Sequence, residues 1–414
     1  MTDATLAAQA EAPSPAVAPP PGNPRFPLFD ALRAIAVLAV LAFHVCILSG
    51  ALERPVVGDV ALQLGALGPV VFFAISGFLL YRPWVAARAA GGPPPRTARY
   101  ARRRALRILP AYWVALTVLA VFPGIAGVFT GDWWRYYLFL QAYDDRTLAS
   151  GIPVAWTLCV EVVFYVALPF WALLLRRLRL GAGPRAWVRA ELLALAVLAA
   201  IAVAIQIAAG RQQVSHLLAQ SALGQGVWLG LGMALAVANV VTPADGARSA
   251  GVRLVAAHPG LCWAGALAAL AALALLNRDV DGLLALVASL QSPQPVAKII
   301  TGIALTGLVI VLLLAPAIFA SRAGGLPRRV LATRPLVWLG VVSYGVYLWH
   351  LTIAELLARG AMPAQFDAQG LDLAARLPFA VTPILFVLTL VASSGVAAAS
   401  YRLVELRFLR RKER

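Results

Sequence analysis

Apolar runs of about 20 residues, each the length of a membrane-crossing helix, recur along this chain from residue 28 to residue 402 and limit its fold more than any other feature. Only 13% of the residues are charged, whereas soluble domains carry about a quarter, and the mean hydropathy is +0.81. The sequence therefore predicts an all-α polytopic membrane protein with about ten transmembrane helices. The predicted spans are residues 28–49, 60–82, 104–128, 152–175, 190–209, 219–240, 257–276, 297–320, 335–358 and 377–402.

The 35 Lys and Arg residues are unevenly divided among the connections between these spans. The connections after spans two, four, six and eight and the C-terminal segment, counted with the span ends that border them, hold 25 of them, while the other connections hold seven basic and nine acidic residues. Cytoplasmic loops carry the excess of Lys and Arg in membrane proteins, so we expect both termini in the cytoplasm. The net charge of +17 is then a topology signal and a contact for lipid headgroups, and nucleic-acid binding is not expected.

The chain divides into one membrane domain and two short tails. Residues 1–24 are rich in Ala and Pro and lack the basic and apolar regions of a signal peptide, so we expect a disordered cytoplasmic tail. Residues 25–402 form the transmembrane domain, and residues 403–414 form a basic cytoplasmic tail. The three cysteines lie in predicted spans without metal-ligand spacing, so neither a metal site nor a disulfide is predicted.

The first span carries three ionisable residues in the stretch FDALRAIAVLAVLAFHV, although charge at membrane depth is costly. Asp30 and Arg33 are spaced i,i+3 and can pair. His44 follows Arg33 by 11 residues, which is three turns plus about 20°, so both lie on one face about 16 Å apart along the axis. One interpretation is a functional pair, and the other is an interfacial arginine with a packed histidine.

Two further motifs lie in the second and third spans. Ser76-Gly77 interrupts the aromatic run FFAISGFLLYRPW, and we interpret these small residues as a packing device that lets helices approach closely. In ARRRALRILPAYW, Arg104 and Arg107 are spaced i,i+3 at the expected cytoplasmic end and project from one face. Paired guanidinium groups suit phosphate, and the alternative is that both are topology signals only.

The fourth span places Glu161 well inside the membrane in the stretch AWTLCVEVVFYVALP. An unpaired carboxylate at that depth is expensive, so a functional role is favoured. Thr157 and Tyr165 share its helix face at i−4 and i+4.

The ninth span contains a polar stripe in SYGVYLWHLTI, because Ser343, Tyr347 and His350 recur at i, i+4 and i+7. The stripe fits either a functional site or hydrogen bonds that hold helices together. The other histidines, His216 and His258, lie near span ends and are interpreted as interfacial.

Taken in order, these five stretches resemble the motifs of the acyltransferase 3 family of membrane O-acyltransferases. The family's motifs are an Asp-x-x-Arg-x10-His opening, a Phe-Phe-x-x-Ser-Gly-Phe helix, an Arg-x-x-Arg-Ile-x-Pro segment, a Trp-Ser-Leu-x-x-Glu-x-x-Phe-Tyr stretch and a Ser-Tyr-x-x-Tyr-x-x-His stretch. The resemblance spans residues 25–402. Ala31 and Ala34 stand where the family usually has glycines, and Val162 stands where a second acid often follows the Glu.

The resemblance implies an enzyme of the bacterial cytoplasmic membrane that moves an acyl group, often acetyl, from acyl-CoA to a hydroxyl of a carbohydrate or secondary metabolite. CoA is anionic and cytosolic, so it needs cations at an inner opening. The predicted CoA-binding residues are Arg33, Arg104 and Arg107, with Asp30 beside Arg33. An extended pantetheine arm can cover the ~16 Å from Arg33 to His44. The implied partners are acyl-CoA, a hydroxyl-bearing acceptor and membrane lipids, and no metal is expected.

The predicted catalytic residues are His44, Glu161, Tyr347 and His350. His44 takes the proton of the acceptor hydroxyl as general base, and Glu161 orients that imidazole or stabilises its charged form. Tyr347 or His350 donates to the thioester oxyanion. The sequence shows no nucleophile-elbow motif, which favours direct transfer over an acyl-enzyme, and Cys159 is the alternative nucleophile.

A second class of protein fits the same buried residues: a proton-coupled transporter or flippase of a small metabolite or lipid-linked glycan. Its Arg, His and Glu side chains would form a proton relay. Transporters often show internal repeats, and matching halves are not visible in this sequence. The enzyme is therefore preferred, while the acceptor, the acyl chain length and the oligomeric state stay open.

Overall fold

The computed structural model describes residue 26 and residues 28–178, 186–242, 250–278, 291–320, 326–361 and 378–410. Within these ranges the chain folds into helices without strands. The long helices are α2 (Leu28–Leu48), α3 (Pro55–Ala89), α4 (Thr97–Val121), α7 (Trp156–Arg177), α8 (Ala186–Gly210), α10 (Gly226–Val241), α12 (Pro259–Leu276), α14 (Val296–Phe319), α16 (Arg334–Ala361) and α18 (Pro378–Ser400).

The all-α polytopic fold class is confirmed. In the described part of the chain, nine helical segments are long and apolar enough to cross a membrane. The remaining predicted span, residues 219–240, corresponds to α10, which has 16 residues and is shorter than the ~20 that a perpendicular crossing needs. The predicted N-terminal tail, residues 1–24, lies outside the described residues, and the cytoplasmic location of the termini stays a prediction.

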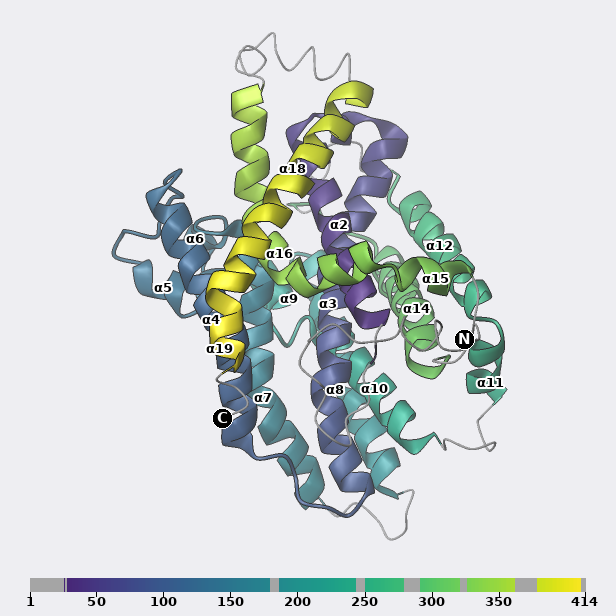
Figure 1. The fold of residues 1–414 in the computed structure, drawn as a ribbon. Coiled ribbons are helices and arrows are strands. Elements are labelled where there is room, and N and C mark those ends of the chain that lie inside the picture. The colour runs from purple at the N-terminus through teal and green to yellow at the C-terminus, as the bar shows by residue number, and fades with distance from the viewer. Residues whose placement is uncertain are drawn as a thin grey trace, which may run out of the picture.

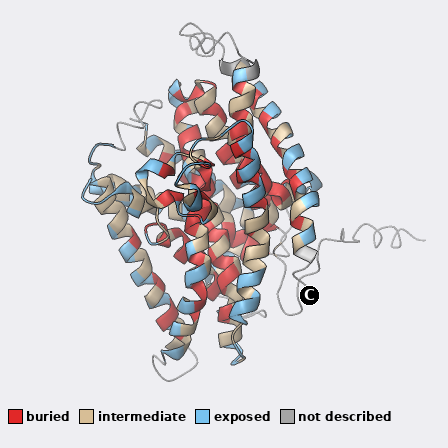
Figure 2. Ribbon diagram, turned by 90° about the vertical axis from the view of Figure 1, so that its left-hand side faces the viewer, coloured by how far each residue is buried: buried red, intermediate tan, exposed pale blue. Residues whose placement is uncertain are grey.

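Helices α2 and α3 form the centre of the bundle (Figure 1). Helix α3 packs along α10 and α2, α2 packs along α16, and α16 packs along α18. Buried positions face inward, whereas exposed positions lie on the outer faces of the helices (Figure 2). Many outer positions are large and apolar, such as Phe170, which is 69% exposed, and Leu193, which is 67% exposed. Such side chains suit lipid contact, which supports a bundle that sits in a membrane.

Glycines set the close contact between α3 and α10. A methyl group on Gly77 would overlap the Leu229 carbonyl, and one on Gly232 would overlap the Ala74 carbonyl. The interpretation of Gly77 as a packing residue is therefore confirmed. Small residues let helix backbones approach closely. Here they fix the position of Ser76, the residue that precedes Gly77.

The third span differs from its prediction, because α4 runs over Thr97–Val121 rather than residues 104–128. A hydropathy window begins where the arginines end, but Ala and Arg are strong helix formers and continue the helix toward its N-terminus. On the other side the helix ends before Pro123, because a proline disfavours the helical conformation of the residue that precedes it, and Phe122 is extended. Consequently Arg104 and Arg107 lie within α4, with two helical turns before them.

The C-terminal end also differs from its prediction. The chain stays helical past residue 402, first as a π-helical turn, Tyr401–Glu405, and then as α19, Leu406–Arg410. Glu405 is only 2% exposed, so this part of the expected cytoplasmic tail packs into the bundle. Residues 411–414 lie outside the described residues.

Short helices occupy several of the connections. They are η2 (Ala51–Glu53), α5 (Trp133–Tyr137), η3 (Gln141–Tyr143), α6 (Asp145–Leu148), η4 (Pro153–Ala155), α9 (His216–Gln220), α11 (Ala250–Ala257) and α15 (Leu326–Leu331). In the connection between α4 and α7, Asp144 forms ion pairs with Arg135 and Arg146. Hydrogen bonds from Arg146 lower the pKa of the Asp144 carboxyl to about 2, so it stays ionised at neutral pH.

Candidate active site

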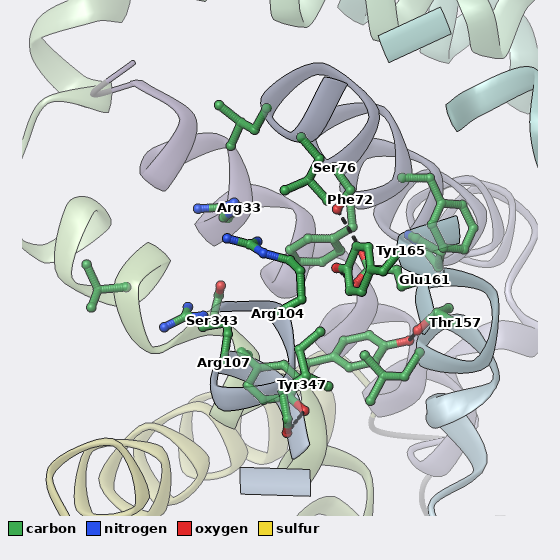
Figure 3. Close-up of a pocket in the computed structure, with 18 of the residues that line it drawn as sticks. Arg33, Phe72, Ser76, Arg104, Arg107, Thr157, Glu161, Tyr165, Ser343 and Tyr347 are labelled. Carbon is green, nitrogen blue, oxygen red and sulfur yellow. Dashed lines mark hydrogen bonds between the residues drawn. The ribbon is translucent and has the colours of Figure 1, made fainter. Parts of the chain in front are cut away.

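A cavity of about 520 Å³ lies between α2, α3, α4, α7 and α16, and the turns after α18 close one side. Its lining includes three arginines, Arg33 from α2 and Arg104 and Arg107 from α4. Figure 3 shows the three guanidinium groups on one side of the cavity and Glu161 with Tyr165 on the other. The structure therefore brings together all three arginines that the sequence pattern singled out.

Two of these arginines have carboxylate partners. Arg33 lies 3.4 Å from Asp30, the i,i+3 pair expected from the sequence. Arg107 lies 3.4 Å from Glu405, which was not predicted because it fell in the expected tail. The Nε of Arg104 is buried, and no described group accepts a hydrogen bond from it. Among the three, Arg104 is the arginine whose buried Nε has no acceptor within the described residues.

Glu161 lies in the same cavity and accepts two hydrogen bonds. The Ser76 hydroxyl donates one over 2.8 Å, and the Tyr165 hydroxyl, one turn along α7, donates the other over 2.5 Å. Glu161 also attracts Arg33 and Arg104 electrostatically. The sequence did not assign Ser76 to the site, because a serine beside a glycine in an apolar helix indicates packing as readily as chemistry.

Each arginine of the cavity has an acidic side chain near it. Asp30 and Glu405 pair with Arg33 and Arg107 from outside the cavity lining, and Glu161 lies in the lining itself. A buried charge is tolerated when it is paired in this way. An anionic ligand would compete with the carboxylates for the arginines, and Arg guanidinium groups bind phosphate oxygens with a planar fork of donors.

His44 and His350 form a pair outside the cavity lining. His44 Nδ1 lies 3.2 Å from His350 Nε2, and neither residue lines the cavity. Tyr347 lines the cavity, and its ring centroid lies 5.8 Å from that of His350 and 6.0 Å from that of Phe72. Tyr347 therefore links the two regions, since its ring contacts both the cavity and His350.

Tyr347 is held by α7 and the turn before it. Its hydroxyl donates to the Val154 carbonyl over 2.8 Å and lies 2.9 Å from the Thr157 hydroxyl. Ser343, the first residue of the predicted stripe, lines the cavity and donates to the Gly340 carbonyl. The stripe thus divides, since Ser343 and Tyr347 face the cavity while His350 faces His44.

Glu161 and His44, which the sequence analysis expected to interact, have different partners. The hydrogen bonds of Glu161 go to Ser76 and Tyr165, while His44 contacts Val40 and His350. The reason is their depth: Glu161 shares the layer of Arg33, and His44 lies about 16 Å further along α2. An orienting contact from Glu161 to His44 is therefore not present in this arrangement.

Cys159, the alternative nucleophile, is buried and lies outside the cavity lining. Its thiol donates to the Ala155 carbonyl over 3.4 Å. Across the described residues, no group of three or more His, Cys, Asp or Glu is arranged to hold a metal ion.

Comparison with known proteins gives one family match and several relatives. A family model described as an acyltransferase domain matches residues 27–398. Peptidoglycan O-acetyltransferase OatA of Listeria monocytogenes is 24% identical over 352 residues, which is 80% of this chain and 49% of that protein. No solved structure matches the chain.

Two further relatives match shorter segments. Acyltransferase MdmB of Streptomyces mycarofaciens is 29% identical over 38% of this chain and 42% of its own length. Nodulation protein 10 of Rhizobium leguminosarum is 30% identical over 41% of this chain and 48% of its own length. The chain thus spans about half the length of the curated relatives that it matches, or less.

Proposed function

The chain belongs to the acyltransferase 3 family, whose model covers residues 27–398, and on that premise we propose that it is a membrane O-acyltransferase that uses acyl-CoA as its donor. One observation carries the proposal: three arginines converge on one cavity, and a histidine pair lies beside Tyr347, a residue of the cavity lining. The family membership also favours an enzyme over the proton-coupled transporter.

The arginine layer is the proposed site for the phosphates of CoA. The Nε of Arg104 has no acceptor among the described residues, while Arg33 and Arg107 are paired with carboxylates that a phosphate can displace. Charge-assisted hydrogen bonds to a guanidinium fork are among the strongest available in proteins. In this proposal Glu161 does not orient His44 but acts as the counter-charge that positions Arg33 and Arg104 before the donor arrives.

The pantetheine arm then has to reach the histidine pair. Arg33 and His44 are 11 residues apart on α2, or about 16 Å along the helix axis, which suits an extended arm. We propose that the arm passes between Phe72 and Tyr347, whose ring centroids lie 6.0 Å apart in this structure. We infer that donor binding moves these rings apart.

In the proposed reaction His44 is the general base. The oxygen of the acceptor hydroxyl attacks the thioester carbonyl carbon while its proton passes to the His44 imidazole. The carbon–sulfur bond breaks, the acyl ester forms, and the departing CoA thiolate takes the proton from the imidazolium. No acyl-enzyme is needed, and Cys159 takes no part.

The acceptor is proposed to be a hydroxyl of a carbohydrate or of a glycosylated secondary metabolite. The name of OatA refers to O-acetylation of peptidoglycan, and peptidoglycan is one acceptor with carbohydrate hydroxyls. Acetyl is the proposed acyl group, and the proposed location is the bacterial cytoplasmic membrane.

The test uses the purified full-length protein in lipid nanodiscs. Acetyl-CoA binding is measured first, and release of free CoA thiol is then followed with a set of glycan and glycoside acceptors. His44→Ala and His44→Gln should each lose on the order of 10²–10⁴ in kcat, the usual contribution of a general base, and should bind CoA like the parent. His258→Ala, which removes an exposed histidine, is the control and should be fully active.

Substantial transfer by His44→Gln with normal folding would show that His44 is not the base. If the parent protein does not bind acetyl-CoA, acyl-CoA is not its donor.

A further inference from the structure

The contacts around His44 and His350 identify which nitrogen of each ring carries its proton. His350 Nδ1 lies 2.9 Å from the Tyr347 carbonyl oxygen and 3.2 Å from that of Val346. His44 Nδ1 lies 2.8 Å from the Val40 carbonyl oxygen. The two rings meet through His44 Nδ1 and His350 Nε2, 3.2 Å apart.

The protonation of His350 follows from its two carbonyl neighbours. A carbonyl oxygen only accepts hydrogen bonds, so a lone pair on Nδ1 would face two further lone pairs. His350 Nδ1 therefore carries the proton. In a neutral ring the other nitrogen then has the lone pair, so His350 Nε2 is an acceptor directed at His44.

The same reasoning applies to His44. Its Nδ1 faces the Val40 carbonyl and the lone pair of His350 Nε2, and both of these accept. His44 Nδ1 therefore carries the proton and shares it between the two acceptors. The remaining nitrogen, His44 Nε2, is left with an available lone pair.

We propose that His350 is a positioning residue that holds His44 in the Nδ1–H tautomer and makes His44 Nε2 the basic atom of the reaction. This inference rests on the proposed function and replaces the oxyanion-donor role that the sequence suggested for His350. The tautomer of an imidazole is set by the hydrogen bond that its other nitrogen makes. When Nε2 takes the acceptor proton, the Nδ1–H of the imidazolium keeps its bond to His350 Nε2.

The surroundings of the pair explain why a neutral partner is used. The ring centroid of Phe43 lies 5.1 Å from that of His44, and the ring centroid of Tyr347 lies 5.8 Å from that of His350. A carboxylate at this depth of the membrane would be costly to bury. A second imidazole accepts from Nδ1–H without adding a permanent charge.

The first test reads the tautomers directly and needs no turnover. The chain has four histidines, so the ¹⁵N spectrum of histidine-labelled protein in nanodiscs is simple, and His44→Gln and His350→Gln assign the two signals. At a pH where both rings are neutral, His44 and His350 should each show a protonated Nδ1 and an unprotonated Nε2. A protonated Nε2 on His44 would overturn the proposal even if the protein proves to be an acyltransferase.

The second test compares two replacements of His350 for kcat, CoA affinity and thermal unfolding. His350→Gln offers an amide oxygen that can accept from His44 Nδ1–H, whereas His350→Phe preserves the ring volume without an acceptor. His350→Phe should lose on the order of 10²-fold or more in kcat, and His350→Gln should recover at least tenfold of that loss. CoA affinity should be unchanged in both.

Equal kcat values for the two folded variants, whether both high or both low, would contradict an acceptor role and reduce His350 to packing. If neither variant folds, the tautomer spectrum of the parent decides the matter alone. If the parent shows no acyl transfer, the proposed function is wrong. The tautomer spectrum still tests the hydrogen bond between His44 and His350, because it does not depend on activity.

Discussion

The Ser76 hydroxyl on α3 donates a 2.8 Å hydrogen bond to the Glu161 carboxylate on α7, and this contact joins two helices beside the arginines of the cavity. Gly77, the next residue, packs against the Leu229 carbonyl on a different helix. The Ser76-Gly77 dipeptide therefore has two roles. Gly77 allows α3 to pack closely against α10, and Ser76 hydrogen-bonds Glu161 from the position that this packing sets.

Substitutions at these two neighbours should separate the two purposes. Ser76→Ala removes one donor to a buried carboxylate, and hydrogen bonds to charged groups contribute about 1.5–3 kcal/mol. It should fold but bind CoA more weakly, because Glu161 loses the position from which it holds Arg33 and Arg104. Gly77→Ala should lower the thermal unfolding temperature, because the new methyl overlaps the Leu229 carbonyl.

Both variants are compared by thermal unfolding and by CoA titration. Ser76→Thr keeps the hydroxyl and is the matched control for Ser76→Ala. Equal CoA affinity of Ser76→Ala and the parent would show that the contact serves only to pack the two helices.

The arginines of α4 offer a test of the donor site with a built-in control. Arg104→Ala and Arg107→Ala should each weaken CoA binding about ten- to a hundredfold, the loss of about 1.5–3 kcal/mol for a charged hydrogen bond. The lysine variants should recover only part of it, because an ammonium group cannot make a bidentate contact. Arg99→Ala removes the same charge from an exposed position of the same helix and should bind like the parent.

Calorimetric titration of CoA and of 4′-phosphopantetheine measures both effects. CoA that binds the Arg104→Ala/Arg107→Ala double variant as tightly as the parent would mean that these arginines only orient the protein in the membrane.

The ring contact between Phe72 and Tyr347 is predicted to control access to the histidine pair. Phe72→Ala removes one of the two rings, so a thioester can approach His44 without an acceptor in place. The rate of acetyl-CoA hydrolysis in the absence of acceptor should therefore rise several-fold above that of the parent. Leu79→Ala shortens another side chain of the cavity lining and should leave this rate unchanged.

An unchanged hydrolysis rate in a folded Phe72→Ala protein, with normal acyl transfer, would place the route of the donor elsewhere.

The topology prediction rests on the division of 25 against seven basic residues between the two sets of connections. Single cysteines placed at Arg96 and at Arg146 should react with an impermeant reagent from opposite sides of a sealed vesicle. Arg146 is suited to labelling because its side chain is 72% exposed, whereas the neighbouring Asp144 is fixed by ion pairs. Labelling of both positions from one side is the result that the ten-span arrangement does not permit.

The fold could be predicted from the sequence because a membrane-spanning helix is a local property of about 20 consecutive residues. The start of α4 could not, since the apolar span was predicted to begin at Arg104, while helix propensity continues the helix back to Thr97. The buried role of Glu405 was missed for a similar reason, because a residue in a basic segment beyond the last apolar run gives no local sign that it packs against Arg107.

The pairings within the site could not be predicted for a different reason. Helical periodicity gives the face of one helix, and it correctly grouped Asp30 with Arg33. It does not give the rotation or depth of one helix against another, which decide that Ser76 reaches a carboxylate 85 residues away. The same holds for His44 and His350, which are 306 residues apart in the chain.

The central claim is that acyl-CoA places its phosphates on the arginine layer and its thioester at His44. A structure of the full-length protein with bound acetyl-CoA, or with a non-hydrolysable thioether analogue, tests it most directly. We predict phosphate density in contact with Arg104 and Arg107, separated rings of Phe72 and Tyr347, and the acyl carbonyl within reach of His44 Nε2. Nucleotide density outside this cavity, or an acyl group that ends beside Glu161 with the two rings still closed, would contradict it.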